Sequence, residues 1–383
     1  MSFYQMMQLG PATLKPRIKE SIDKKEKRKY IAALVLKSVL CLIFCISFVS
    51  IFSAIFGEDN SIVGVVSVIL LLTFRFSNLD FDVKETVFAI LGIYAIYAIC
   101  PYLASISNPY LALMINFISI LILIIISCHN TQLSNQSTIA LSYLLLYGYK
   151  VNSKEVYINR IFALILGGLI VASIFYFKQR KKKFENRFLD ILKDIDIRDP
   201  RTRWQIKISI IISTGILIGE LLHLERTMWI GFACMSIMQP QKDKVIGRMI
   251  ERPIYSILGC VVFTVIYFAI PKESVAVIGM LGGIMVGFSA TYRWQVVFNT
   301  FGALSAAVTI FGLNNAILLR IIANILDYTK EENKVSGEKI YCLKVECNDL
   351  IFNVCINEKD LIGEPEIGRR FKGNIWMQGN VCL

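Results

Sequence analysis

Charged residues and histidines are scarce in this chain of 383 residues. Charged residues make up 18% of it, against about 25% in a soluble domain, and there are two histidines. A phosphate-binding GxxxxGKS or GxxxxGKT motif is missing, so the sequence predicts no ATPase of its own. No Ser/His/Asp or paired-carboxylate constellation stands out either. We therefore expect no catalytic residue, no enzyme activity and no cofactor.

Closely paired cysteines are also missing, although the chain has ten cysteines. Six lie in or beside apolar runs, where a free cysteine behaves as a small hydrophobe. The four near the C-terminus are separated by 5, 8 and 27 residues, unlike the CxxC pairs of a zinc site. The sequence therefore predicts neither a disulfide framework nor a metal site. These four are Cys342, Cys347, Cys355 and Cys382.

Apolar sequence is what the chain has in abundance. Apolar residues make up 55% of it and come in long runs, and the mean hydropathy is +0.57. About 20 apolar residues are enough for a helix to cross the hydrocarbon core. The pattern predicts an all-α polytopic membrane protein with about 12 transmembrane helices. The predicted segments are 31–56, 61–74, 86–103, 111–127, 137–147, 158–177, 206–222, 228–238, 254–270, 274–288, 296–311 and 316–326.

Basic residues gather at the ends and junctions of the apolar runs. Residues 1–30 hold eight basic and three acidic residues, and residues 178–203 hold ten and five, a net of +5 in each. Segments rich in Lys and Arg stay in the cytoplasm, so we expect both termini there. Membrane orientation accounts for much of the net charge of +12, which makes membrane lipid the expected partner and nucleic acid an unlikely one.

Glycine landmarks recur between the two halves. Gly64 and Gly92 are 28 residues apart, and so are Gly231 and Gly259. With six segments in each half, the halves would be two parallel six-helix repeats, in which Gly92 and Gly259 shape their helices. A chance likeness between apolar sequences is the alternative. The predicted domains are a basic cytosolic N-terminus 1–30, a first bundle 31–177, a cytosolic linker 178–205, a second bundle 206–326 and a tail 327–383.

The richest group of charges follows Pro240, which we expect to end its helix and to shape an inner loop. Arg248 and Arg252 are four residues apart and would share one helix face, where two guanidiniums can bind a carboxylate. Glu251 could neutralise one of them. The alternative is that the three residues anchor the helix on the cytoplasmic side.

Four further cations stand in or beside apolar segments. Lys37 and Lys207 lie near the cytoplasmic ends of the opening helices, and Arg160 and Arg320 near the outward starts of the last helices of each half. A central Arg or Lys costs about 2.5–3.5 kcal/mol in a membrane and is usually functional. Paired cations would suit an anionic solute, and snorkelling to the headgroups is the alternative. Trp229 would either anchor the interface or stack on an aromatic substrate.

The polar tail, residues 327–383, has the pattern of strands rather than of apolar helices. Residues 340–346 and 350–356 predict two strands around the turn signal Cys347-Asn-Asp349, and 371–381 could supply more. We expect a small β-rich cytosolic segment. It could sense a ligand, dock a partner or cap the bundle.

The second half contains an ordered series of landmarks. It runs from Arg203-Trp-Gln-Ile-Lys207, through Trp229-Ile-Gly and Gln239-Pro240, to the arginine-rich loop and the helix with Ser256-Ile-Leu-Gly259. This order resembles the fusaric-acid-resistance-like (FUSC) family, also described as aromatic acid exporters. The resemblance covers roughly residues 29–326.

The resemblance implies a multi-pass protein of the bacterial plasma (inner) membrane that exports organic, often aromatic, acids. Its partner would be a small organic anion, attracted by basic residues along a path between the repeats, and a homo-oligomer is compatible with it. The linker of 26 residues at 178–203 and the last helix are shorter than the family pattern. The alternatives are an anion channel, or a membrane scaffold that signals through the C-terminal β segment.

Overall fold

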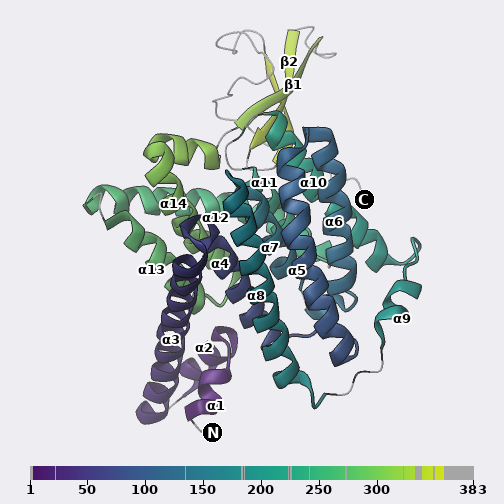
Figure 1. Ribbon diagram of the computed structural model, residues 1–383. Coiled ribbons are helices and arrows are strands. Elements are labelled where there is room, and N and C mark those ends of the chain that lie inside the picture. Colours follow the sequence, from purple (N-terminus) through teal and green to yellow (C-terminus); the bar gives the residue numbers. More distant parts are fainter. Residues whose placement is uncertain are drawn as a thin grey trace. The chain divides into compact units, whose positions relative to one another are not determined.

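A computed structural model gives the fold of the chain (Figure 1). It describes residues 3–357 apart from positions 22, 134, 183, 185, 223, 225–226, 241, 272–273, 322, 333–338 and 348–349. The chain divides into two compact units. Unit 2 is Leu36–Arg248, and unit 1 joins Met1–Val35 to Met249–Leu383.

Unit 2 is helical. Two long helices, α3 (Lys24–Phe56) and α12 (Lys242–Ala269), belong partly to each unit. Between them lie η1 (Glu58–Asn60), α4 (Ser61–Phe74), α5 (Val83–Ile106), α6 (Pro109–Ser127), η2 (Thr131–Leu133), α7 (Gln136–Gly148), α8 (Lys154–Gln179), α9 (Phe188–Lys193), α10 (Pro200–Leu221) and α11 (Met228–Ile237). Helix α4 packs against α7 and α8, α5 packs against α6 and α8, and α10 packs against α6 and α11.

Several of these helices begin where the sequence supplies a capping side chain. Asp82 accepts the backbone N–H groups of Lys84 and Glu85 at the start of α5, at 2.8 and 3.3 Å. Asn108 and Asp199 cap α6 and α10, and a proline follows each of them. Proline suits the first helical position because the N–H that it lacks has no partner there. These capping residues and prolines determine the residue at which each helix begins, which the apolar composition alone does not.

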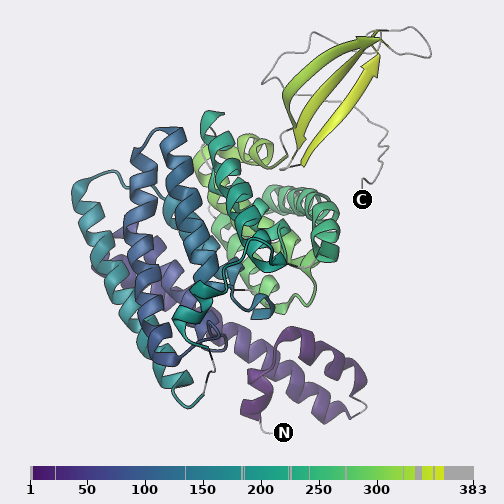
Figure 2. The same cartoon turned by 90° about the vertical axis from the view of Figure 1, so that its right-hand side faces the viewer.

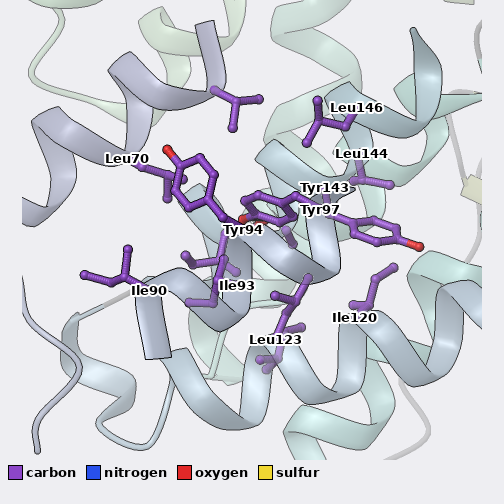
Figure 3. Packing of buried hydrophobic residues seen from close by; sticks show 14 of the residues in the cluster. Leu70, Ile90, Ile93, Tyr94, Tyr97, Ile120, Leu123, Tyr143, Leu144 and Leu146 are labelled. Atoms are coloured by element: carbon purple, nitrogen blue, oxygen red, sulfur yellow. Dashed lines mark hydrogen bonds between the residues drawn. The ribbon is translucent and has the colours of Figure 1, made fainter. Parts of the chain in front are cut away.

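The core of unit 2 is apolar but encloses buried tyrosines (Figure 3). The hydroxyl of Tyr97 donates to the carbonyl oxygen of Ile139 at 2.8 Å, and that of Tyr94 donates to Ser67 Oγ at 3.3 Å. A buried hydroxyl costs free energy unless it is hydrogen-bonded. These bonds therefore hold α5 in register with α7 and α4.

Glycines bring α7, α10 and α11 close together. Gly148 at the end of α7 faces Met228, and Gly231 of α11 faces Leu144, whose Cδ2 would lie 2.7 Å from an added Cβ. Gly219 of α10 faces the start of α11 in the same way. Small residues let helix backbones approach closely in a membrane, where burial of apolar surface gives little driving force. Gly231, a landmark of the sequence repeat, therefore serves helix packing.

The loop after α4 and the linker before α10 are joined at one end of unit 2. The backbone N–H of Asp82 donates to the carbonyl of Asn186 at 3.0 Å, and the Asn186 side chain donates to the carbonyl of Asp80 at 3.2 Å. The N–H of Phe188 donates to Glu85 Oε2 at 2.6 Å. Part of the predicted linker 178–205 thus belongs to unit 2.

Unit 1 contains a small apolar cluster near the N-terminus. Met6, Leu14, Tyr30 and Leu34 are buried in it, and Phe288 packs against them. Helices α13 and α14 pack against each other. The helices that this unit adds are α1 (Phe3–Gln8), α2 (Pro11–Glu20), α13 (Val275–Phe288) and α14 (Tyr292–Ile321).

A three-stranded antiparallel sheet follows α14 (Figure 2). Its strands lie in the order β1 (Ala323–Glu332), β2 (Lys339–Cys347), β3 (Leu350–Asn357). Tyr341 lies opposite Ile356, and Ala323 lies opposite Cys347. Strands β2 and β3 occupy the positions at which the sequence predicts strands, whereas 371–381 lies outside the described residues.

Among the described residues, six helices are long and apolar enough to cross a membrane. They are Lys24–Phe56, Val83–Ile106, Pro109–Ser127, Lys154–Gln179, Pro200–Leu221 and Glu251–Ala269. Met228–Ile237 and Val277–Phe288 are shorter apolar helices. These helices indicate a multi-pass membrane protein, while the layout of about 12 crossing helices in two repeats stays a prediction.

The end of the second bundle differs from the prediction. The segments 296–311 and 316–326 were expected to be separate helices, but α14 runs through both without a break to Ile321. The expected turn at 312–315 rests on one glycine and two asparagines, which cost a helix at most about 1 kcal/mol each. The expectation of helix up to residue 326 is also wrong, because β1 begins at Ala323.

The compact units divide the chain differently from the predicted bundles, which stay a prediction. Helices α10 and α11 were assigned to the bundle 206–326, yet they pack against α6 and α7 within unit 2. Hydropathy predicts which segments are helices but not which faces meet. Here the glycines of α10 and α11 determine the close contacts.

Substitution of two neighbouring glycines of α13 tests how α13 packs against α14 in unit 1. A Cβ on Gly282 would lie 2.7 Å from the Phe298 carbonyl oxygen of α14, whereas one on Gly283 would meet nothing within 4 Å. We expect Gly282→Ala to lower the free energy of unfolding by about 1–3 kcal/mol through overpacking. Gly283→Ala should leave it unchanged or raise it slightly. Thermal unfolding in detergent measures both, and equal midpoints would contradict the packing of α13 on α14.

Candidate functional site

Glu220 is an acidic residue in an apolar helix. It lies in the last turn of α10, one of the candidate membrane spans. The carbonyl end of a helix carries partial negative charge, which makes it an unfavourable place for a carboxylate. Ionisable residues in membrane segments are costly and are functional by default, so the partners of Glu220 decide what it can do.

Three donors from other segments converge on Glu220 Oε1. The Tyr147 hydroxyl of α7 donates to it at 3.1 Å, and Thr227 Oγ1, just before α11, at 3.3 Å. Lys150 Nζ, two residues after α7, forms an ion pair with it at 3.9 Å. The carboxylate therefore joins α10 to both of the helices that the glycines bring close.

The polar contacts continue into the core through Asn116 of α6. The Tyr143 hydroxyl donates to Asn116 Oδ1 at 2.8 Å, and the Asn116 side chain also lies beside Tyr147. Asn116 Nδ2 is fully buried and has no hydrogen-bond acceptor in the described part of the chain. An unsatisfied buried donor costs about 1–3 kcal/mol, which an acceptor oxygen from a bound molecule would offset.

The solvent-exposed fraction of the side chains falls from Lys150 at the surface to Asn116 and Tyr143 in the core. The Lys150 side chain is 58% exposed and that of Glu220 23%, whereas Tyr147 is 2% exposed and both Asn116 and Tyr143 are fully buried. We call these five residues the Glu220 cluster. It is a polar path from the surface of unit 2 into its core, and it consists of groups that can bind or pass on a proton or bind an anion.

Glu220 is not among the residues that the sequence pattern predicts to be functional. It stands two residues from the end of the predicted segment 206–222, where a charge would be cheap. An acidic residue within an apolar segment was the available signal. The sequence gives no indication that Tyr147, 73 positions earlier, would face it.

Arg160 was predicted to attract a solute, and in the structure its guanidinium is hydrogen-bonded within the protein. It is 4% exposed, and its guanidinium donates to Asn60 Oδ1 at 3.0 Å and to the carbonyls of Tyr149 and Asp59 at 2.6 and 3.0 Å. It thereby joins α8 to the end of α7 and to the turn before α4. These bonds satisfy much of its donor capacity within the protein.

The residues around α12 have partners that their spacing did not predict. Arg248 Nη1 donates to the carbonyl of Ser236 in the last turn of α11 at 2.9 Å. Glu251 forms an ion pair with Arg293, at the start of α14, at 2.7 Å. The expectation that Glu251 neutralises Arg248 or Arg252 therefore gives way to this pair. Arg252 is half-buried.

The other residues that were predicted to contact the solute lie on four different helices. They are Lys207, Lys37, Arg320 and Trp229. Lys207 is exposed on α10, and Lys37 is half-buried in α3. Trp229 is half-buried in the first turn of α11. Arg320 lies in α14, but its side chain is outside the part of the structure that is described.

The helix-shaping residues differ in what surrounds them. Gly259 of α12 packs tightly, because an added Cβ would lie 2.9 Å from the Val297 carbonyl oxygen. Gly92 of α5 has nothing within 4 Å of such a Cβ, so no contact explains it. Pro240 lies in the bend between α11, which ends at Ile237, and α12. No group of three metal-ligating side chains occurs among the described residues.

Comparison with known families separates two parts of the chain. Residues 213–326 match the family described as fusaric acid resistance protein-like. This segment is fusaric-acid-resistance-like. The resemblance seen in the sequence is thereby confirmed over these residues, which include Glu220, Trp229 and α12. Together with the apolar helices, the match indicates a membrane transporter.

A second match overlaps the end of the fusaric-acid-resistance-like segment. Residues 312–379 match a family described as "Domain of unknown function, E. rectale Gene description (DUF3881)". The two matches overlap at residues 312–326, around the junction of α14 and β1, and the whole sheet lies within the second match. No match was found among curated proteins or solved structures.

Replacing Arg160 tests its structural role. Arg160→Met leaves the buried Asn60 side chain and two carbonyls without their donor, at about 1–3 kcal/mol for each group that water does not reach. We expect a clearly lower unfolding midpoint in detergent. Arg180→Met, an exposed arginine just after the same helix, should change it little. A stable Arg160→Met protein with impaired transport would instead support the solute-binding role.

Proposed function

We propose that this chain exports organic acids, aromatic ones in particular, across the bacterial plasma membrane, with both termini in the cytoplasm. The observation that carries the proposal is the fusaric-acid-resistance-like match at residues 213–326, on a chain with six apolar helices of spanning length in its described part. The basic charge at 1–30 and 178–203 supports the orientation.

The carboxylate of the solute would meet Arg252 and Arg248 near the cytoplasmic end of α12. Arg252 is the better candidate, because Arg248 already donates to the last turn of α11 and Glu251 pairs with Arg293. Lys207 and Lys37 would raise the local concentration of anions at the cytoplasmic ends of their helices. Further along the path, Trp229 in the first turn of α11 would contact the aromatic ring.

Efflux from cells tests this proposal. Cells lacking their own pumps are loaded with a labelled aromatic acid, and the chain is expressed as wild type, as Arg252→Ala or as Arg203→Ala. We expect wild type to speed efflux, and Arg252→Ala to slow it because a carboxylate loses a charge-assisted partner worth about 1.5–3 kcal/mol. Arg203→Ala removes an exposed cation of α10 and should have little effect.

Two outcomes would count against the proposal. Efflux from wild-type cells at the level of an empty vector would remove the exporter function for that acid. Equal losses in Arg252→Ala and Arg203→Ala would show that general positive charge matters, rather than a binding residue on α12. Expression in the membrane fraction is compared first, so that a poorly inserted variant is recognised.

The sheet with its own family match favours a second candidate function, a membrane scaffold that signals through this segment. Deleting residues 335–383 removes β2 and β3 but leaves the helices. Unchanged efflux after the deletion would favour the exporter. A cellular phenotype that disappears while membrane insertion is retained would favour the scaffold, and anion currents in planar bilayers would favour a channel.

A further inference from the structure

The proposed binding of the solute at Arg252 makes no use of the Glu220 cluster, which has features of its own. One carboxylate oxygen accepts hydrogen bonds from Tyr147 of α7 and from Thr227, just before α11, and forms an ion pair with Lys150, just after α7. The cluster lies at the predicted outward end of α10. The arginines of α12 lie at the predicted cytoplasmic end of α12. A second kind of ligand is therefore expected here.

The chemistry of the cluster favours a proton as that ligand. A carboxylate is the one group among the five that both carries negative charge and gains an O–H bond readily. The titratable groups facing it in the described structure are Lys150 and Tyr147; Thr227 and Asn116 are polar but do not titrate. Residues 223 and 225–226 lie outside the described part.

A second observation is the unpaired donor of Asn116. Its Nδ2 is completely buried beside Tyr147 and has no acceptor among the described residues. An oxygen placed there, from a water molecule or from a carboxyl group, would satisfy it and would link Tyr147 to Tyr143. Polar groups then extend without a break from the exposed Lys150 to the fully buried Tyr143.

We propose that Glu220 binds the proton whose inward movement drives export. This inference rests on the proposed function. A proton from the outer solution forms an O–H bond with the Glu220 carboxylate, which becomes neutral, and the same proton is later released to the cytoplasm. No other bond is made or broken, and no electron is transferred.

Protonation changes the contacts that join α10 to its neighbours. Lys150 loses its counter-ion, and the Tyr147 and Thr227 hydroxyls lose a charged acceptor, whose hydrogen bonds are about twice as strong as those to a neutral one. The bonds between α10, α7 and α11 therefore weaken when the proton binds. Tyr147 is a positioning residue in this scheme, since its hydroxyl holds the carboxylate toward the path.

The experiment compares two transport modes in proteoliposomes, with labelled 4-hydroxybenzoate as the probe and protein-free liposomes subtracted. The first mode is exchange of labelled for unlabelled probe at equal pH on both sides. The second is accumulation of probe against its gradient, driven by a pH difference. Glu220→Gln keeps the size of the side chain but cannot bind a proton, and Glu155→Gln changes an exposed glutamate in the first turn of α8 as the control.

We expect Glu220→Gln to retain exchange and to lose pH-driven accumulation down to the protein-free level. Its exchange rate should no longer vary with pH. Tyr147→Phe should keep exchange and shift the pH profile of accumulation, which a merely structural role would not do. Glu155→Gln should behave as wild type in both modes.

The outcomes separate this inference from the proposed function. No exchange by the wild type would overturn export of this probe and the coupling with it. Wild-type exchange together with full accumulation by Glu220→Gln would overturn the role of Glu220 and leave the exporter intact. If Glu220→Gln also loses exchange, Glu220→Asp is measured next. Recovery of both exchange and accumulation by Glu220→Asp supports a proton-binding carboxylate. If Glu220→Asp lacks one or both modes, the role of Glu220 in proton binding is overturned.

Discussion

The close approach of α7, α10 and α11 is the constraint on which the candidate site depends. Gly148, Gly219 and Gly231 remove the side chains that would hold these helices apart. The spacing that results lets one carboxylate oxygen of Glu220 reach donors from two neighbouring segments. In a bilayer, where lipid tails are as apolar as leucine, such close packing and interhelical hydrogen bonds replace the hydrophobic effect as the forces that hold helices together.

Much of the helical architecture could be predicted from the sequence, because lipid imposes long apolar runs and charge imposes their orientation. Asn108-Pro109 and Asp199-Pro200 fix helix starts by local chemistry alone. The ends are less predictable, as α14 shows, since glycine and asparagine weaken a helix without breaking it. The partners of Arg160 and Glu251 could not be predicted, because most of them depend on which helix faces meet across 42 to 101 positions of sequence.

Two arginines show how a membrane protein can use cations to join its own helices. Arg160 and Arg248 both donate to carbonyls at helix ends, Tyr149 after α7 and Ser236 in α11, where the partial negative charge of the helix favours them. The same residues read as solute-binding in the sequence, because a carbonyl and a carboxylate attract a guanidinium alike. Burial and donor geometry separate the two roles, and spacing along the chain does not.

The bonds of Arg160 also bear on the order of biosynthesis. All three of its acceptors precede it, Asp59 and Asn60 by about 100 positions and Tyr149 by 11. At roughly 5–20 residues per second, the ribosome takes on the order of 5–20 s to pass from the first acceptors to the arginine. A charged helix therefore leaves the translocon when its acceptors have already been made, and its insertion is expected to depend on the earlier helices remaining beside the exit until it arrives.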